Sequence, residues 1–229
     1  MTKFRRVTLA GVFALAMGGT QASVLTVGNA DYSNADCTFW CVQRYQQLYD
    51  ASQFPGAINI TGISFFAYPY PPTAAYLSWN GASTWRMTVS TTSATLGALN
   101  ATFASNVGGD AIIYDTETFS GTPAFGDLIS FIGSFNYDPS LGNLLVDIER
   151  IAGNAEGVQM QAGFNPGVFD RAYNHTDTVL VEFGGSNQNG YANRTQFGFG
   201  PVVATIPEPG SLALLALGLA GLGYSRRKR

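Results

Sequence analysis

Short stretches in which apolar and polar residues alternate recur along the interior of the chain. In residues 57–66, Ile58 and Ile60 alternate with Asn59, and residues 85–90 alternate in the same way. Similar segments cover residues 111–114, 128–135, 143–151, 178–183 and 196–205. Because successive side chains of a strand point to opposite faces, a period of two predicts β-strands with one buried face.

Residues that favour turns separate these segments at short intervals. They are Pro55-Gly56, Asn80-Gly81, Gly108-Gly109, Pro139 with Gly142-Asn143, Asn165-Pro166-Gly167, Gly184-Gly185 and Asn189-Gly190. Seven or more short strands without a long amphipathic helix predict an all-β fold. We expect an antiparallel β-sandwich of jelly-roll or immunoglobulin-like type.

Two stretches depart from this pattern. Residues 38–54 fit a helix loosely, and they also fit an extended strand in which Tyr45, Gln47 and Tyr49 share one face. The aromatic content favours the strand. Residues 69–72 hold three prolines in four positions, so they predict a loop, because proline cannot donate to a strand ladder.

The first 22 residues have the pattern of a secretory signal peptide. A basic start is followed by an apolar segment at residues 7–17, and small and polar residues then lead to Ala22. A segment of that length is too short to span a bilayer comfortably. We therefore expect export, with cleavage after Ala22 and a mature chain that begins at Ser23.

The last 23 residues contain three parts in series. Pro207, Glu208 and Pro209 come first, and a mostly apolar segment at residues 211–224 follows. The chain then closes with the basic residues Arg226, Arg227, Lys228 and Arg229. Prolines end a preceding strand, and terminal basic residues hold a short membrane helix with its end on the cytoplasmic side. The sequence thus predicts a short C-terminal transmembrane helix with the body outside.

These three parts together resemble the PEP-CTERM sorting signal of Gram-negative bacteria that make exopolysaccharide. The resemblance covers residues 207–229. It implies export by the general pathway, transient anchoring in the inner membrane, and processing by an exosortase, a membrane protease that recognises the Pro-Glu-Pro triplet. Stretches of the body, at residues 44–54, 60–66, 77–94 and 137–148, also resemble exported PEP-CTERM proteins, which implies a β-sandwich and carries over no site residue.

The composition and charge of the chain argue against a nucleic-acid partner. The chain is 46% hydrophobic and only 12% charged. Seven of its twelve basic residues lie in the two tails, so five arginines face fourteen acidic residues between Ser23 and Ile206, a net charge of −9. Because nucleic-acid affinity depends on Lys and Arg that neutralise phosphates, we expect no nucleic-acid partner.

Few residues offer catalytic or cofactor chemistry. His175 is the only histidine and sits among polar turn residues, and no Gly-x-Ser-x-Gly motif is present, so we expect neither a catalytic triad nor a cofactor. Cys37 and Cys41 are the only cysteines, and an exported location favours a disulfide between them. We interpret this pair as a covalent staple of an N-terminal loop.

Two pairs of carboxylates are candidates for acid–base groups. Asp115 with Glu117, and Asp147 with Glu149, would each share one face of a strand. Catalytic carboxylates of glycosidases converge on the scissile bond, whereas neighbours on one exposed strand usually form a solvated polar face. Calcium could use the acidic loop residues Asp36, Asp110, Asp138 and Asp177, although no calcium-loop motif is present. We expect no metal site.

Aromatic rings beside amides suggest one alternative function. Tyr68 and Tyr70, Trp79-Asn80, Trp85 and residues 187–191 could stack on sugar rings and bond their hydroxyls, although core packing is the simpler interpretation. The leading hypothesis is a non-enzymatic exported protein with a body at residues 23–206, sorted to the cell surface or an extracellular polysaccharide (biofilm) matrix. The alternative is a carbohydrate-binding module or adhesin of that matrix, and a secreted glycoside hydrolase ranks third.

Overall fold

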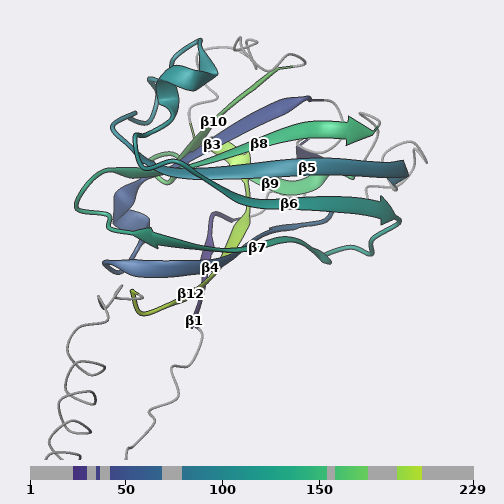
Figure 1. Cartoon of the computed structure of the whole chain (residues 1–229), viewed down its shortest axis with the longest axis horizontal. Helices are drawn as coiled ribbons and strands as arrows, with labels where there is room; N and C mark the ends of the chain where they lie inside the picture. The colour runs from purple at the N-terminus through teal and green to yellow at the C-terminus, as the bar shows by residue number, and fades with distance from the viewer. Residues whose placement is uncertain are drawn as a thin grey trace, which may run out of the picture.

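The body of the protein is an antiparallel β-sandwich (Figure 1). A computed structural model describes residues 23–29, 35–36, 42–68, 79–153, 158–174 and 190–202. One layer is a four-stranded sheet in the order β1-β12-β4-β7, and the other is a five-stranded sheet in the order β10-β3-β8-β5-β6. A small sheet in the order β11-β9-β2 lies beside them. Every pairing between these strands is antiparallel.

The strands have the following bounds. The four-stranded sheet contains β1 (Ser23–Val27), β12 (Thr195–Gly200), β4 (Ile58–Phe66) and β7 (Leu128–Tyr137). The five-stranded sheet contains β10 (Phe169–Asn174), β3 (Arg44–Tyr49), β8 (Asn143–Gly153), β5 (Trp79–Thr92) and β6 (Ile112–Gly121). The small sheet contains β11 (Tyr191–Asn193), β9 (Met160–Phe164) and β2 (Ala35–Asp36). Two short 3-10 helices are η1 (Ala51–Gln53) and η3 (Phe103–Asn106).

The core lies between the two larger sheets and is rich in aromatic rings. On the four-stranded side, Phe197 pairs across the ladder with Ile63, and both are fully buried. On the opposite side Tyr49 packs edge-on against Phe197 with 5.0 Å between ring centroids. This packing explains the alternation of apolar and polar residues in the sequence, because every second side chain of these strands enters the space between the sheets.

A buried polar network joins β3 to the strand that leads into β12. The Tyr45 hydroxyl donates to Gln47 Oε1 at 2.9 Å, and the Gln47 side-chain amide donates to the Asn193 carbonyl at 2.8 Å. The Tyr49 hydroxyl lies 2.7 Å from Thr195 Oγ1. Burial raises the pKa of the Tyr49 hydroxyl above its ordinary range, against the opposing effect of its bonds to Thr195 and Gln47.

The strand predictions are largely confirmed. Residues 44–49 form β3, and Tyr45, Gln47 and Tyr49 share its core-facing side, as the extended interpretation of residues 38–54 requires. β5 and β6 run well beyond the predicted segments 85–90 and 111–114, and β1, β9 and β10 were not predicted. Residues 69–72 and 178–183 lie outside the described part of the chain, as do 203–205 at the end of the predicted last strand.

The edges of the two larger sheets meet at β6 and β7. The Asp115 carboxylate on β6 accepts a hydrogen bond from the Ile132 backbone N–H on β7 at 2.6 Å. The Tyr114 hydroxyl donates to the Ile60 carbonyl at 3.3 Å, and burial raises the pKa of that hydroxyl. A methyl group added at Gly133 would lie 2.5 Å from the Tyr114 carbonyl oxygen, so only glycine permits this close approach.

Candidate functional site

The point where both tails join the body is the first candidate site. β1 is the edge strand of the four-stranded sheet and pairs with β12 in a register that sets Ser23 opposite Phe199. The expected first residue of the mature chain is thus next to the last strand before the C-terminal segment. Both ends of the body leave from neighbouring positions on one sheet edge.

The connection from the body to the C-terminal triplet is short. β12 ends at Gly200, and residues 201–206 separate it from Pro207. Six extended residues span at most about 20 Å. A membrane protease that acts at the triplet therefore works close to the β1–β12 edge. Pro207, Glu208, Pro209 and the four terminal basic residues lie outside the described residues, and so does Ala22.

Charge divides the two larger sheets sharply. The strands β1, β4, β7 and β12 contain no Asp, Glu, Lys or Arg. The five-stranded sheet carries nine such residues, which are Arg44, Arg86, Asp115, Glu117, Asp147, Glu149, Arg150, Asp170 and Arg171. The strands from which the tails leave therefore contribute no charged side chain, although Arg194, directly before β12, lies over the Phe66 ring.

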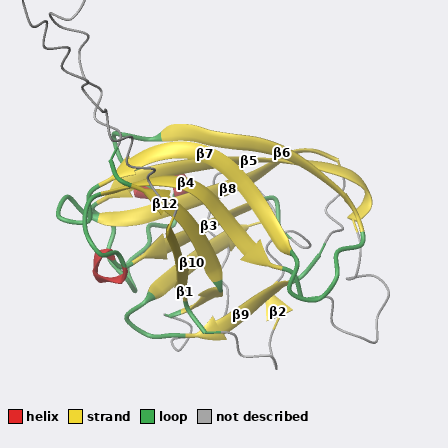
Figure 2. Cartoon of the chain, turned by 90° about the horizontal axis from the view of Figure 1, so that it is seen from below, coloured by secondary structure: helices red, strands yellow, loops and turns green. Residues whose placement is uncertain are grey.

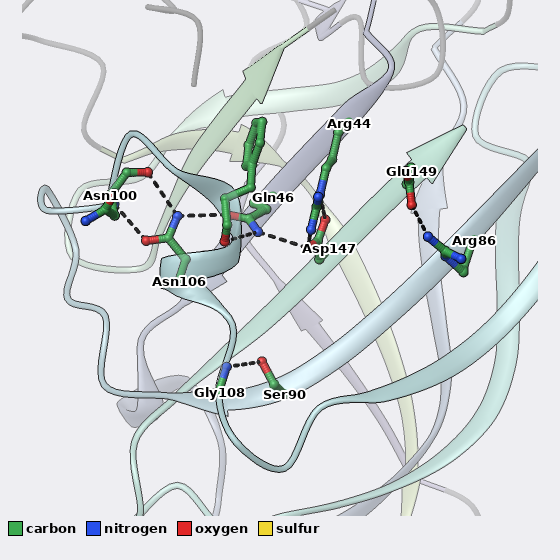
Figure 3. Close-up of polar contacts among 10 residues, drawn as sticks. Arg44, Gln46, Arg86, Ser90, Asn100, Asn106, Gly108, Asp147 and Glu149 are labelled. Carbon is green, nitrogen blue, oxygen red and sulfur yellow. Dashed lines mark hydrogen bonds and ion pairs between the residues drawn. The ribbon is translucent and has the colours of Figure 1, made fainter. Parts of the chain in front are cut away.

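The outer face of the five-stranded sheet carries a cluster of ion pairs (Figure 3). Arg44 on β3 contacts Asp147 on β8 at two points, with Nε 2.9 Å from Oδ1 and Nη2 2.7 Å from Oδ2. Arg86 on β5 pairs with Glu149 on β8. The first pair is the more buried, since the Asp147 side chain is 4% exposed and the Arg86 side chain 39%.

The segment between β5 and β6 covers part of this cluster (Figures 1 and 3). Phe103 in η3 is fully buried and lies under the Arg44 guanidinium, 5.3 Å from its ring centroid. The Asn106 amide donates to Gln46 Oε1 at 2.8 Å, and the Gln46 amide donates to Asp147 Oδ2 at 2.9 Å. Gly108 N–H donates to Ser90 Oγ at 3.0 Å. The segment is thus bonded to the sheet rather than poised above an open cleft.

The expectation of a solvated carboxylate face is wrong for Asp147 and Glu149. β8 is the central strand of the five-stranded sheet, and both carboxylates pair with arginines from the strands on either side. Asp115 is half-buried at the seam with β7, where it binds a backbone N–H. The two acidic pairs sit on opposite faces of the sheet, so they do not converge as glycosidase carboxylates must.

Three of the aromatic candidates for sugar binding, Tyr68, Trp79 and Trp85, are buried. Trp85 is fully buried, and Trp79 and Tyr68 are 4% and 8% exposed. Trp79 stacks on Phe119 with 5.3 Å between centroids. The partly exposed Tyr191 lies under the Arg171 guanidinium at 4.4 Å from its ring centroid. The core-packing interpretation is therefore confirmed for Tyr68, Trp79 and Trp85.

The structure describes some of the remaining candidate residues and not others. Asp110 accepts a hydrogen bond from the Thr91 N–H, and Asp138 accepts one from the Ser140 N–H. The bonds from Ser140 lower the pKa of the Asp138 carboxyl. Within the described residues, no group of three or more His, Cys, Asp or Glu could hold a metal ion. Cys37, Cys41, His175, Asp177 and Tyr70 lie outside those residues, as do 187–189.

Sequence reasoning missed the partners within the cluster. Arg44 and Asp147 are 103 positions apart, and Asn106 is 60 positions from Gln46. A local signal existed in the polar residues at alternate positions 44 and 46 of a strand whose other face is aromatic. That signal marks a polar face, but it does not identify the strand that will supply the opposite charge.

Comparison with known proteins identifies the C-terminal segment alone. Residues 205–229 match the PEP-CTERM protein-sorting motif, which confirms the resemblance stated from the three-part pattern. The motif indicates a protein that is exported, anchored transiently in the membrane through its C-terminus and sorted by an exosortase. No curated protein and no solved structure matches the chain. Among the described residues, no helix has the length and apolar character to cross a membrane.

Proposed function

We propose that this protein is a non-enzymatic exported β-sandwich that an exosortase releases to the cell surface or the extracellular polysaccharide matrix of a Gram-negative bacterium. The match of residues 205–229 to the sorting motif carries the proposal. The position of the body adds support, because Ser23 and Phe199 lie opposite each other and both tails leave from one edge. The protease then acts beside a body that is already folded.

The ion pairs and hydrogen bonds of the described carboxylates support a non-enzymatic function. Asp147 and Glu149 are held by arginines, and Asp115 binds a backbone N–H of the neighbouring sheet. Asp170 accepts hydrogen bonds from the N–H groups of Gly97 and Gly190. Each of these carboxylates joins parts of the fold, and a group occupied in this way is poorly placed to transfer protons to a substrate.

The alternative functions receive less support. Sugar binding through stacked rings would need exposed aromatic side chains, whereas Tyr68, Trp79 and Trp85 are core residues. A glycoside hydrolase would need two convergent carboxylates, and the two candidate pairs lie on opposite faces of one sheet. We therefore do not assign the function of the protein in the matrix to a sugar-binding site formed by these rings. We assign it to the exported body as a whole.

Replacement of the Pro-Glu-Pro triplet tests the proposal. In cells, Pro207, Glu208 and Pro209 are changed together to alanine, and the membrane and surface fractions are analysed by intact-mass spectrometry. We expect the variant to stay in the membrane with Arg226–Arg229 attached, while the parent is shortened and released. Pro201→Ala is the matched control, because it removes a proline from the same connection outside the matched residues. Identical C-terminal masses of parent and triplet variant would reject the proposal.

A further inference from the structure

The outer face of the four-stranded sheet has an unusual central row. Across the four strands, Val24 pairs with Gly198, Gly198 with Gly62, and Gly62 with Ile132. Val24 is 63% exposed and Ile132 65%. The two glycines between them carry no side chain, and a methyl group added at Gly62 would lie 3.7 Å from Ile132 Cδ1. The row thus sets two glycines between two exposed aliphatic side chains (Figure 2 looks onto this sheet).

The rows on either side of this central row also lack charged residues. Thr26, Gln196, Ser64 and Ser130 follow on one side. Gly200, Asn59 and Asn136 follow on the other. Leu128, 43% exposed, extends the apolar surface along β7. The four strands thus place no charged side chain on this outer face, whereas the body between Ser23 and Ile206 has a net charge of −9. The guanidinium of Arg194, directly before β12, lies over the Phe66 ring at the end of this face, 4.3 Å from the ring centroid.

We propose that this outer face, centred on Val24, Gly198, Gly62 and Ile132, lies against the lipid bilayer while the chain is still anchored by its C-terminal segment. The inference rests on the membrane anchoring in the proposed function and adds the orientation of the body. β12 ends at Gly200, and residues 201–210 connect it to the apolar segment that begins at Ser211. Ten extended residues reach at most about 35 Å, so the tether keeps this sheet beside the membrane.

Charge decides which face turns toward the lipid. The five-stranded sheet presents the partly exposed pair of Arg86 and Glu149 on its outer face, and turning this face to the membrane would desolvate that pair. The four-stranded sheet, whose strands carry no charged side chain, avoids this cost. Because the tether raises the local concentration of the surface, a small exposed aliphatic patch is enough to bias the orientation.

The chain offers a matched pair of reporters for this orientation. Ile132 is exposed on the four-stranded sheet, and Ile151 on β8 of the other sheet is also exposed, at 47%. The full-length chain, with isoleucine and valine methyl groups labelled, is reconstituted in nanodiscs of phosphatidylethanolamine and phosphatidylglycerol that contain a lipid with a gadolinium chelate on its headgroup. We expect strong paramagnetic broadening of the Ile132 and Val24 methyl signals and little broadening at Ile151.

Variants separate a specific contact from simple proximity to the tether. Ile132→Glu places a carboxylate in the central row, and we expect it to reduce the broadening at Val24, whereas Ile151→Glu leaves that broadening unchanged. Equal broadening at Ile132 and Ile151 in a chain that stays in the discs would overturn the orientation and leave the anchoring intact. Changes in the Ile132 methyl signal that depend on the number of chains per disc and not on gadolinium would show that a second copy of the chain covers this face. That result would also overturn the proposed orientation. A full-length chain that fails to enter the discs would instead contradict the membrane anchoring itself.

Discussion

Arg44 and Asp147 form a two-point ion pair across β3 and β8, with contacts of 2.9 Å and 2.7 Å between the guanidinium and the carboxylate. The Asp147 side chain is almost completely removed from solvent and also accepts a hydrogen bond from Gln46. This pair fixes the register of two neighbouring strands and supports the segment that covers them. The ion pair therefore stabilises the fold, and its contribution to the free energy of unfolding can be measured.

Replacement of Asp147 by Asn should destabilise the protein strongly. The change removes the carboxylate that the Arg44 guanidinium contacts at two points, where the Asp147 side chain is 4% exposed, and we expect a loss of about 2–4 kcal/mol in the free energy of unfolding. Glu149→Gln is the matched control, because its more exposed pair with Arg86 should contribute less than about 1 kcal/mol. Denaturant unfolding of the mature protein measures both. Equal losses for the two variants would contradict the ranking.

Asn106 should determine how firmly the covering segment is held. Its side chain donates to Gln46 and to the Asn100 carbonyl and accepts from the Asn100 N–H. Asn106→Ala removes the bond to the buried Gln46 Oε1 and both bonds to the more exposed Asn100, and we expect a loss of about 1–3 kcal/mol in the free energy of unfolding. Hydrogen exchange should accelerate at residues 97–108 while β4 and β7 stay protected. Faster exchange throughout the chain would show instead that the segment is coupled to global unfolding.

Alkaline pH should destabilise the body through its buried tyrosines. Burial raises the pKa of the Tyr49 and Tyr137 hydroxyls in the folded state, whereas the unfolded chain ionises near the ordinary value of about 10. The stabilisation from these groups is thus complete below about pH 10 and is lost as the pH rises above it. Denaturant midpoints measured at increasing pH should fall in that range. A Tyr49→Phe variant with the same pH slope as the parent would refute the contribution of Tyr49.

The mature chain should begin at Ser23. That residue is the first of β1, and Leu25 and Val27 of the same strand pack against the core, so cleavage after Ala22 leaves the strand whole. Intact-mass measurement of the exported protein checks this. A chain that still begins at Met1 would contradict the export prediction. A start after Val27 would mean that β12 becomes the edge of its sheet.

The sequence by itself determined the all-β class and most of the strands, because a period of two in apolar residues is a local property that a sheet with one buried face imposes. It also determined the sorting signal, since the triplet, the apolar segment and the basic end are contiguous between Pro207 and Arg229. The shortest strands, β2 with two residues and β11 with three, carry too few residues for that period to be detected.

Only the tertiary structure decided what the polar residues do. Asp147 looked like part of a solvated face because its partner, Arg44, lies on a strand 103 positions away, and no local pattern encodes that pairing. The neutral row of Val24, Gly198, Gly62 and Ile132 likewise draws one residue from each of four strands. Strand order and register bring such residues together, and both depend on how the sheets bury their apolar faces against each other.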